Sequence, residues 1–297
     1  MPEMKAVAGP AAGLLNGQVA IVTGGTVGIG RATGVALTRD GAQVVIVGRS
    51  RERLEQTLAE LARHQTGPEP LALALDVRQE ADMAEMASRT LERFGRIDIL
   101  VTAAGILRSG AGDLRTLQHM SVPEWDEVLD TNLKGVFLAN RAVLPAMISR
   151  RRGNIVNVSS TSGRQGLAFD SAYCASKLGV IGLSEALAEE MRHYGIRVQV
   201  LLPGAIDTGM WSQNPLPRPK DILSVDRVAD FIRYLVTLPA DVIMPDSVIE
   251  PLKTRLHLSW SGSTPEPGRA SATGPGVKAT VAEASEDQEG RRKIPHD

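Results

Sequence analysis

Short apolar runs alternate with longer amphipathic stretches along most of the chain. Runs of strand length are expected at 18–23, 42–48, 70–76, 97–101, 153–158, 196–202 and 246–251. Stretches of helical length are expected at 29–39, 50–64, 79–94, 123–150, 171–194 and 225–238. Runs that are apolar throughout, such as 44–47, are typical of parallel strands covered on both faces. The alternation predicts a doubly wound α/β fold, a Rossmann-type parallel sheet of about seven strands with ligands at the strands' carboxyl ends.

The alternation ends near residue 258. From Ser259 onward the chain is rich in Ser, Gly, Pro, Glu and Ala and has almost no large apolar residues. Such a segment cannot bury enough surface to offset the entropy lost on ordering. We therefore predict a flexible segment at 1–14, a single catalytic domain at 15–258 and a disordered tail at 259–297.

Composition narrows the class of protein. Of 297 residues, 43% are apolar and 23% are charged, as in ordinary globular chains, and the formal net charge is −1. We expect no nucleic-acid or membrane partner, because no strong field and no apolar run of about 18 residues is present. The first 17 residues lack the sustained apolar core of a signal peptide. The single cysteine, Cys174, excludes an internal disulfide and predicts a cytoplasmic location.

Tyr173 and Lys177 are four residues apart within a predicted helix. This spacing places both side chains on one helix face, with about 5–6 Å between the Cβ atoms. A cation one turn away favours the phenolate and is expected to lower the pKa of Tyr173. The phenol is then suited to general acid–base catalysis, and a hydroxyl such as that of Ser160 can stabilise charge on the same substrate oxygen.

A glycine-rich turn follows the first predicted strand and opens a helix. Gly24, Gly28 and Gly30 have the spacing G-x-x-x-G-x-G, which differs from the G-x-G-x-x-G fingerprint. The absence of side chains lets the backbone approach a pyrophosphate, and the helix N-terminus offers free N–H groups and a positive dipole end. The turn predicts a dinucleotide site. The five histidines show no metal-ligand spacing, so no metal is expected.

Taken together, these motifs resemble those of the short-chain dehydrogenase/reductase family over about residues 15–252. The matching segments are Thr23-Gly24-x-x-x-Gly28-x-Gly30, Asp76-Val77, Thr102-Ala103-Ala104-Gly105, Asn132, Ser160, Tyr173 with Lys177, and Pro203-Gly204-Ala205-Ile206-Asp207-Thr208. The chain departs from the family at Thr102 and Ala103, where the family has two asparagines, and this affects local strand hydrogen bonds.

The resemblance implies a catalytic tetrad of Asn132, Ser160, Tyr173 and Lys177. In that scheme Tyr173 exchanges a proton with the substrate oxygen and Ser160 holds this oxygen. Lys177 lowers the pKa of Tyr173 and binds the nicotinamide ribose, and Asn132 holds a water that leads to bulk solvent. The implied cofactor contacts are Gly24, Thr26, Gly28, Ile29, Gly30, Asp76, Val77, Ala104, Gly105, Tyr173, Lys177, Pro203, Gly204, Ile206 and Thr208.

The end of the second predicted strand indicates which dinucleotide is bound. Gly48 occupies the position where NAD-binding sites usually have an acid, and Arg49 follows it. An arginine suits a 2′-phosphate, which an acid would repel. We predict NADP(H) as the preferred cofactor, with NAD(H) possible; the alternative is that Arg49 only extends into solvent.

The substrate side carries fewer signals. Leu167 and Phe169 lie between the serine and the tyrosine, and Met210 and Trp211 lie in a proline-rich loop that is a candidate lid. These residues predict a small-molecule substrate, a largely apolar ketone or secondary alcohol. The predicted function is an NADP(H)-dependent carbonyl reductase or alcohol dehydrogenase. The alternatives are a 3-oxoacyl-thioester (acyl carrier protein) reductase and a non-catalytic NADPH-sensing regulator. The family resemblance also implies a homodimer or homotetramer.

Overall fold

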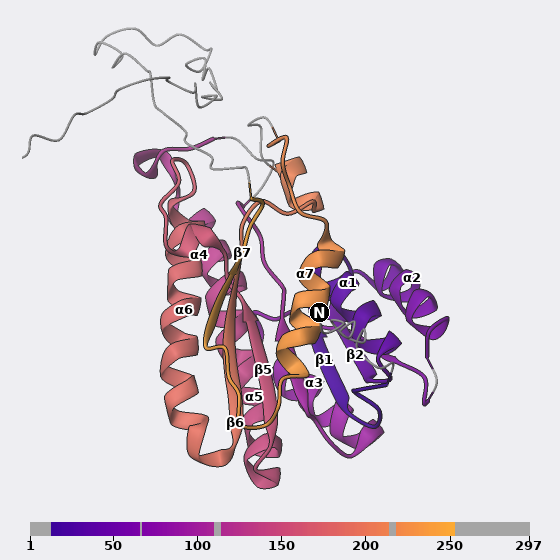
Figure 1. Ribbon diagram of the computed structural model, residues 1–297. Helices are drawn as coiled ribbons and strands as arrows, with labels where there is room; N and C mark the ends of the chain where they lie inside the picture. Colours follow the sequence, from indigo (N-terminus) through magenta and orange to yellow (C-terminus); the bar gives the residue numbers. More distant parts are fainter. Residues whose placement is uncertain (1–12, 66, 110–113, 214–217, 253–297) are drawn as a thin grey trace, which may run out of the picture. The chain divides into compact units, whose positions relative to one another are not determined.

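One parallel sheet organises the chain, in a computed structural model that describes residues 13–65, 67–109, 114–213 and 218–252 (Figure 1). Its strand order is β3-β2-β1-β4-β5-β6-β7. The strands are β1 Val19–Thr23, β2 Gln43–Gly48, β3 Leu71–Ala74, β4 Ile99–Thr102, β5 Gly153–Val158, β6 Ile196–Pro203 and β7 Asp246–Ile249. The predicted doubly wound parallel sheet is confirmed. The predictions for 1–12 and for the tail from 259 lie outside the described residues.

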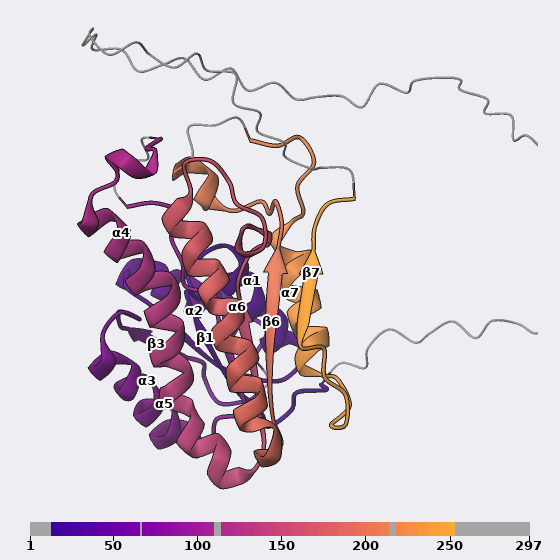
Figure 2. The same cartoon turned by 90° about the vertical axis from the view of Figure 1, so that its left-hand side faces the viewer.

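Helices cover both faces of the sheet because successive residues of each buried strand point to opposite sides. In β1, Ala20 and Val22 pack in the core beneath α1, α2 and α7, whereas Val19 and Ile21 pack beneath α3, α5 and α6 (Figure 2). The helices are α1 Gly28–Arg39, α2 Arg51–Ala62, α3 Glu80–Phe94, α4 Val122–Leu129, α5 Gly135–Arg150, α6 Ser171–Met191 and α7 Val225–Val236. Strands apolar on both faces, as the sequence predicts, are what this layering requires.

The strand order reverses at β1, whose neighbours are β2 and β4. The connections from β1 and β4 therefore leave the sheet in opposite directions and open a crevice at the carboxyl ends. The glycine turn after β1 lies in this crevice, against the residues that follow β4. Among the described residues, no helix is long and apolar enough to cross a bilayer.

The helix expected at 123–150 is interrupted, which corrects the prediction. After α4 the chain forms a π-helical segment, Asp130–Lys134, before α5 begins. Single π turns within α-helices are frequent at functional sites. Here the wider turn carries Asn132, whose side chain is fully buried and bonds backbone groups that follow β4. Apolar periodicity continues through such a turn, so the sequence pattern did not reveal it.

Candidate active site

Four polar side chains gather beyond the ends of β4 and β5, although all are almost inaccessible to solvent. The exposed fractions are 0% for Asn132, 7% for Ser160, 8% for Tyr173 and 5% for Lys177. Ser160 follows β5, Tyr173 and Lys177 are one turn apart on α6, and Asn132 lies in the π turn. The structure thus brings together the four residues that the sequence singled out. Among the described residues, no group of three or more metal-ligating side chains was found.

The Tyr173 phenol is hydrogen-bonded to Ser160, and this contact acts to lower its pKa. Burial nevertheless raises the pKa of Tyr173 to about 12, and the nearby charges of Asp170 and Cys174 add to the rise. The expectation that Lys177 would lower this pKa is therefore wrong for the protein alone. The reason is that transfer of the phenolate out of water outweighs the neighbouring hydrogen bond. The phenol is protonated at neutral pH.

The Lys177 ammonium faces the sheet, and its position explains its small effect on the tyrosine. Its Nζ donates a hydrogen bond of 2.9 Å to the carbonyl oxygen of Val158 and lies 5.7 Å from the centre of the Tyr173 ring. Burial lowers the pKa of Lys177 to about 8. The ammonium is thus anchored to β5 in an apolar setting, where a modest change in pH alters its charge.

Asn132 joins the loop after β4 to α6. Its amide exchanges two hydrogen bonds with the backbone of Ile106, of 2.8 and 2.9 Å, and its Nδ2 donates to the Ser176 hydroxyl at 3.1 Å. A Cβ on Gly105 would lie 3.3 Å from Asn132 Oδ1 and 3.6 Å from Lys177 Nζ. Glycine at this position therefore leaves both side chains facing the same small space.

The departure from the family at Thr102 is compensated locally. The Thr102 hydroxyl donates a hydrogen bond of 2.8 Å to Asn157 Oδ1 on β5. Asn140 of α5 donates to the same oxygen at 3.1 Å, and Asn157 Nδ2 donates to Ser184 of α6 at 3.0 Å. Side chains of β4 and β5 thus remain linked beneath the site, although positions 102 and 103 are not asparagine.

The glycine turn after β1 is closely packed against its surroundings. A Cβ on Gly24, whose φ is 65°, would stand 2.6 Å from the Ala104 nitrogen, and a Cβ on Gly30 would stand 2.3 Å from the Gly24 oxygen. On the other side, a Cβ on Gly28 would meet the Thr208 methyl at 3.3 Å. The turn between β1 and α1 thus brings Gly24, Gly28 and Gly30 beside Ala104 and Thr208, all predicted cofactor contacts, at the N-terminus of α1.

Five of the remaining predicted cofactor residues fall into two groups. Pro203 ends β6, and its carbonyl oxygen accepts a hydrogen bond of 3.4 Å from Ser160. Ile206 is buried beyond it, and Gly204 packs against Glu250. At the other end of the crevice, Val77 is buried against Gly135, and Ile29 is partly buried against the core. These five residues lie at the carboxyl ends of strands, in the segments that follow them, or in the first turn of α1.

Thr26 and Arg49 border the crevice at the end of β2. A Cβ on Gly48 would stand 2.8 Å from the Thr26 methyl, so an acid at this position would displace Thr26. Arg49 is exposed, and its positive charge contributes to a lower pKa of Asp76. Burial opposes this shift, but the hydrogen bonds and charge of Arg78 lower the pKa overall. Arg78 and Asp76 form an ion pair of 2.6 Å, so Asp76 is ionised and oriented at this end of the crevice.

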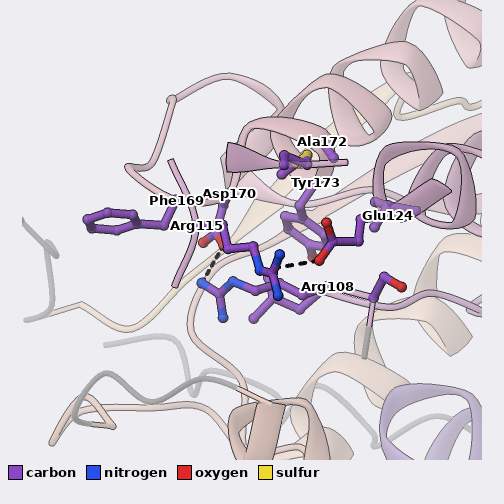
Figure 3. Close-up of a pocket in the computed structure, with 11 residues that line it drawn as sticks. Arg108, Arg115, Glu124, Phe169, Asp170, Ala172 and Tyr173 are labelled. Carbon is purple, nitrogen blue, oxygen red and sulfur yellow. Dashed lines mark hydrogen bonds and ion pairs between the residues drawn. The ribbon is translucent and has the colours of Figure 1, made fainter. Parts of the chain in front are cut away.

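A pocket opens beside Tyr173 (Figure 3). Two ion pairs border it, Arg108 with Asp170 at 2.5 Å and Arg115 with Glu124 at 3.3 Å. The other lining residues are Leu107, Ser109, Met120, Val128, Phe169 and Ala172. Of the four predicted substrate residues, only Phe169 lines this pocket. Trp211 donates a hydrogen bond from its indole N–H to the Ile206 carbonyl oxygen at 2.7 Å. The backbone N–H of Leu167 donates a hydrogen bond to the Cys174 sulfur at 3.4 Å.

Residues between β4 and α4 supply five of the eleven side chains that line the pocket, and the sequence analysis did not identify them. Leu107, Arg108, Ser109, Arg115 and Met120 belong to no motif. The rule that ligands bind beyond the carboxyl ends of parallel strands identifies this connection as a candidate, but it does not select individual residues.

The fold and the site together define a class of protein. A glycine turn at the reversal of a parallel sheet, beside a buried Ser–Tyr–Lys group, is the arrangement of a Rossmann-type, dinucleotide-dependent oxidoreductase. A sequence model described as short chain dehydrogenase matches residues 18–218. The chain therefore belongs to the short-chain dehydrogenase family, and it is an oxidoreductase of that family.

Individual relatives agree with this assignment. A 3-oxoacyl-[acyl-carrier-protein] reductase of Synechocystis sp. is 36% identical over 236 residues, covering 76% of this chain and 92% of that protein. The crystal structure of levodione reductase superposes with a TM-score of 0.73 at 32% identity, covering 80% of this chain and 97% of that one. A metagenomic short-chain oxidoreductase in complex with NADP gives a TM-score of 0.69 at 34% identity, covering 80% and 99%.

Proposed function

We propose that the protein is an NADP(H)-dependent carbonyl reductase, with Tyr173 as the general acid. The observation that carries the proposal is the buried Tyr173 phenol, hydrogen-bonded to Ser160 and protonated at neutral pH. A protonated phenol next to a hydroxyl donor is suited to donate a proton to an oxygen that gains charge. The protonated phenol is the form that carbonyl reduction needs near neutrality.

The residues of the crevice fit a dinucleotide. Gly24 and Gly30 leave no room for a side chain where a pyrophosphate would approach the α1 N-terminus, and Thr208 closes the other side. When bound, NADP(H) supplies the hydride that a carbonyl carbon accepts. Arg49, exposed and without a neighbouring acid at Gly48, supports preference for a 2′-phosphate; NAD(H) stays an alternative.

The chain's own residues would perform the proton chemistry. Tyr173 donates its phenolic proton to the substrate oxygen while the Ser160 hydroxyl holds that oxygen. The Lys177 ammonium lies 5.7 Å from the ring centre and donates to the Val158 carbonyl oxygen, so it fixes the helix turn that carries the phenol. Asn132 faces the same space beside Gly105 and fits the predicted role of holding a water for reprotonation.

We propose a largely apolar ketone as substrate; the pocket beside Tyr173 encloses only about 30 Å³, so it would take the reacting carbonyl group and not the whole molecule. Its apolar side chains, Leu107, Met120, Val128 and Phe169, contribute roughly 25 cal/mol per Å² of apolar surface buried. Leu167, Met210 and Trp211 do not line this pocket and stay predicted substrate contacts that would act only when the substrate extends past it.

A second candidate is reduction of 3-oxoacyl thioesters, which the Synechocystis relative favours. The test is one substrate panel of ketones, aldehydes and acyl thioesters, read by loss of NADPH absorbance. Turnover of simple ketones supports the proposal, whereas turnover confined to carrier-linked or coenzyme-linked thioesters replaces it. NADPH binding in calorimetry without turnover of any compound would favour the non-catalytic regulator.

We also propose that the protein forms a homodimer or homotetramer. Support comes from α5 and α6, which lie side by side and expose Phe137 (42%) and Leu178 (58%) (Figure 2). Light scattering of the purified chain tests this, and a monomer at micromolar concentration would contradict it. The cytoplasmic location stays a prediction that rests on the single cysteine.

A further inference from the structure

A buried ion pair stands between the two segments that enclose Tyr173. Arg108 follows β4, and Asp170 immediately precedes α6. Their side chains are 8% and 7% exposed, and Nη2 lies 2.5 Å from Oδ1. Both residues line the pocket beside Tyr173 (Figure 3). Neither belongs to the tetrad, and no sequence motif points to either.

The Asp170 carboxylate is directed away from its own helix. Asp170 occupies the N-cap position of α6 but makes no side-chain capping bond, although aspartate at this position usually accepts from a backbone N–H of the first turn. Tyr173 is the third residue of that turn. The carboxylate instead bonds Arg108, so the start of α6 is fixed to the β4–α4 connection through this contact.

The backbone just before Asp170 supports a functional reading. Phe169 has φ of 69°, a left-handed conformation that a bulky side chain rarely adopts. Such residues persist where the surroundings enforce them and cluster at active sites. The turn at Phe169 delivers Asp170 to Arg108 and keeps Phe169 at the pocket rim.

Asp170 also acts on Tyr173 electrostatically. Its negative charge raises the pKa of Tyr173. The other groups that face the phenol or its pocket are Ser160 from the segment after β5, Cys174 and Lys177 from α6, Arg108 and Arg115 from the β4–α4 connection, and Glu124 from α4. Burial raises the pKa of Asp170, and Arg108 opposes that rise. Arg108 thus favours the ionised carboxylate next to the catalytic group.

We propose that Arg108 and Asp170 are positioning residues of the reaction, which hold the segment after β4 (103–109) against the first turn of α6 and keep Tyr173 aimed at the pocket. The proposal rests on the proposed function, because it concerns the same phenol. It assigns to the ion pair the shape of the pocket wall beside the phenol, and the charge of Asp170 adds to the effect of burial on the pKa of Tyr173.

The test is the pH profile of kcat/KM for ketone reduction in Asp170→Asn. The alkaline limb should have a first step near pH 8 from Lys177 and a later step from Tyr173. Removal of the negative charge should move the later step about one unit toward lower pH. Loss of the ion pair should lower kcat/KM about tenfold or more, with NADPH affinity unchanged in calorimetry. Asp170→Glu keeps the charge and should keep the wild-type limb. Glu189→Gln removes an exposed ion pair from the far end of the same helix and should change neither quantity.

A purely structural ion pair would lower the melting temperature of Asp170→Asn without moving the limb, and that result overturns the proposal. If Asp170→Asn does not fold, the double variant with Arg108→Gln removes both charges and leaves no unpaired one. It should show a smaller shift in the same direction, because the Arg108 cation is removed as well, and an unshifted limb overturns the proposal. Wild type without turnover would refute the proposed function alone. The ion pair is then tested by tyrosinate absorbance. The titration of Tyr173 is obtained by subtracting the spectrum of Tyr173→Phe, and it is compared between the wild type and Asp170→Asn. An unchanged titration of Tyr173 in Asp170→Asn overturns the proposal.

Discussion

The Lys177 ammonium donates a hydrogen bond of 2.9 Å to the carbonyl oxygen of Val158, and this bond connects α6 to the last residue of β5. The two elements carry the two halves of the proposed catalytic group, because Ser160 follows β5 and Tyr173 lies one turn before Lys177. Together with the bond of 2.7 Å from the Ser159 hydroxyl to the Lys177 carbonyl oxygen, the bond to Val158 keeps the Ser160 hydroxyl and the Tyr173 phenol in register. It also holds the Lys177 ammonium in an apolar setting, which lowers the pKa of Lys177 and makes the stability of the protein depend on pH.

The stability of the protein should rise between about pH 8 and pH 10.5 through Lys177. Burial lowers the pKa of Lys177 from 10.5 to about 8, so in this window the unfolded chain binds a proton that the folded chain has released. Stability rises with pH wherever the unfolded state binds more protons. Lys177→Met removes that contribution. Denaturant unfolding of both proteins from pH 7 to 10.5 measures the difference. Parallel pH profiles of wild type and variant would show that Lys177 titrates normally.

Gly24→Ala should weaken both folding and cofactor binding. The added Cβ would lie 2.6 Å from the Ala104 nitrogen, and the φ of 65° is unfavourable for alanine. We expect about 1–3 kcal/mol less stability and weaker NADPH binding, since the turn must shift toward the crevice. Gly17→Ala is the matched control, because its φ is 71° but nothing lies within 4 Å of the added atom. Equal effects of the two substitutions would assign the loss to backbone conformation rather than to close packing.

Arg49→Asp should reverse the cofactor preference. Loss of a charge-assisted contact costs about 1.5–3 kcal/mol, and the new carboxylate adds repulsion toward a 2′-phosphate. NADPH should bind at least about 10-fold more weakly, while NADH affinity stays similar or improves. Arg51→Asp, an exposed change in the first turn of α2, controls for net charge. Equal losses for both cofactors in fluorescence titrations would remove Arg49 from 2′-phosphate recognition.

The sheet could be predicted because buried parallel strands are apolar on both faces, which leaves an unmistakable run such as Val44–Val47. The four residues of the tetrad could be found because the motifs around them resemble those of the family, whereas the spacing of Tyr173 and Lys177 alone is too common to be diagnostic. In contrast, the π turn at Asn132 has no apolar signature, and it divided a helix that periodicity predicts to be continuous. The structure of the turn depends on a long-range contact with Ile106.

The pKa of Tyr173 and the residues of the pocket wall could not be predicted from the sequence, for a related reason. Helix spacing correctly placed Lys177 near the phenol, but burial depends on everything that packs above both groups. Arg108 lies 62 residues before Asp170 in the chain, and nothing in either neighbourhood signals their contact. Local patterns predict which elements form, whereas desolvation and long-range ion pairs are decided only when the elements are assembled.

The central claim is that Tyr173 is the general acid of a carbonyl reductase, and Tyr173→Phe tests it most directly. The substitution keeps the buried ring and removes the only proton at issue. Turnover of the best ketone with saturating NADPH should fall at least about 10²-fold, the usual range for general acid–base groups. NADPH affinity should stay as in wild type. Tyr234→Phe, at an exposed position on α7, should leave both unchanged. If Tyr173→Phe retained most of the wild-type turnover, the assignment of the phenol as proton donor would be wrong.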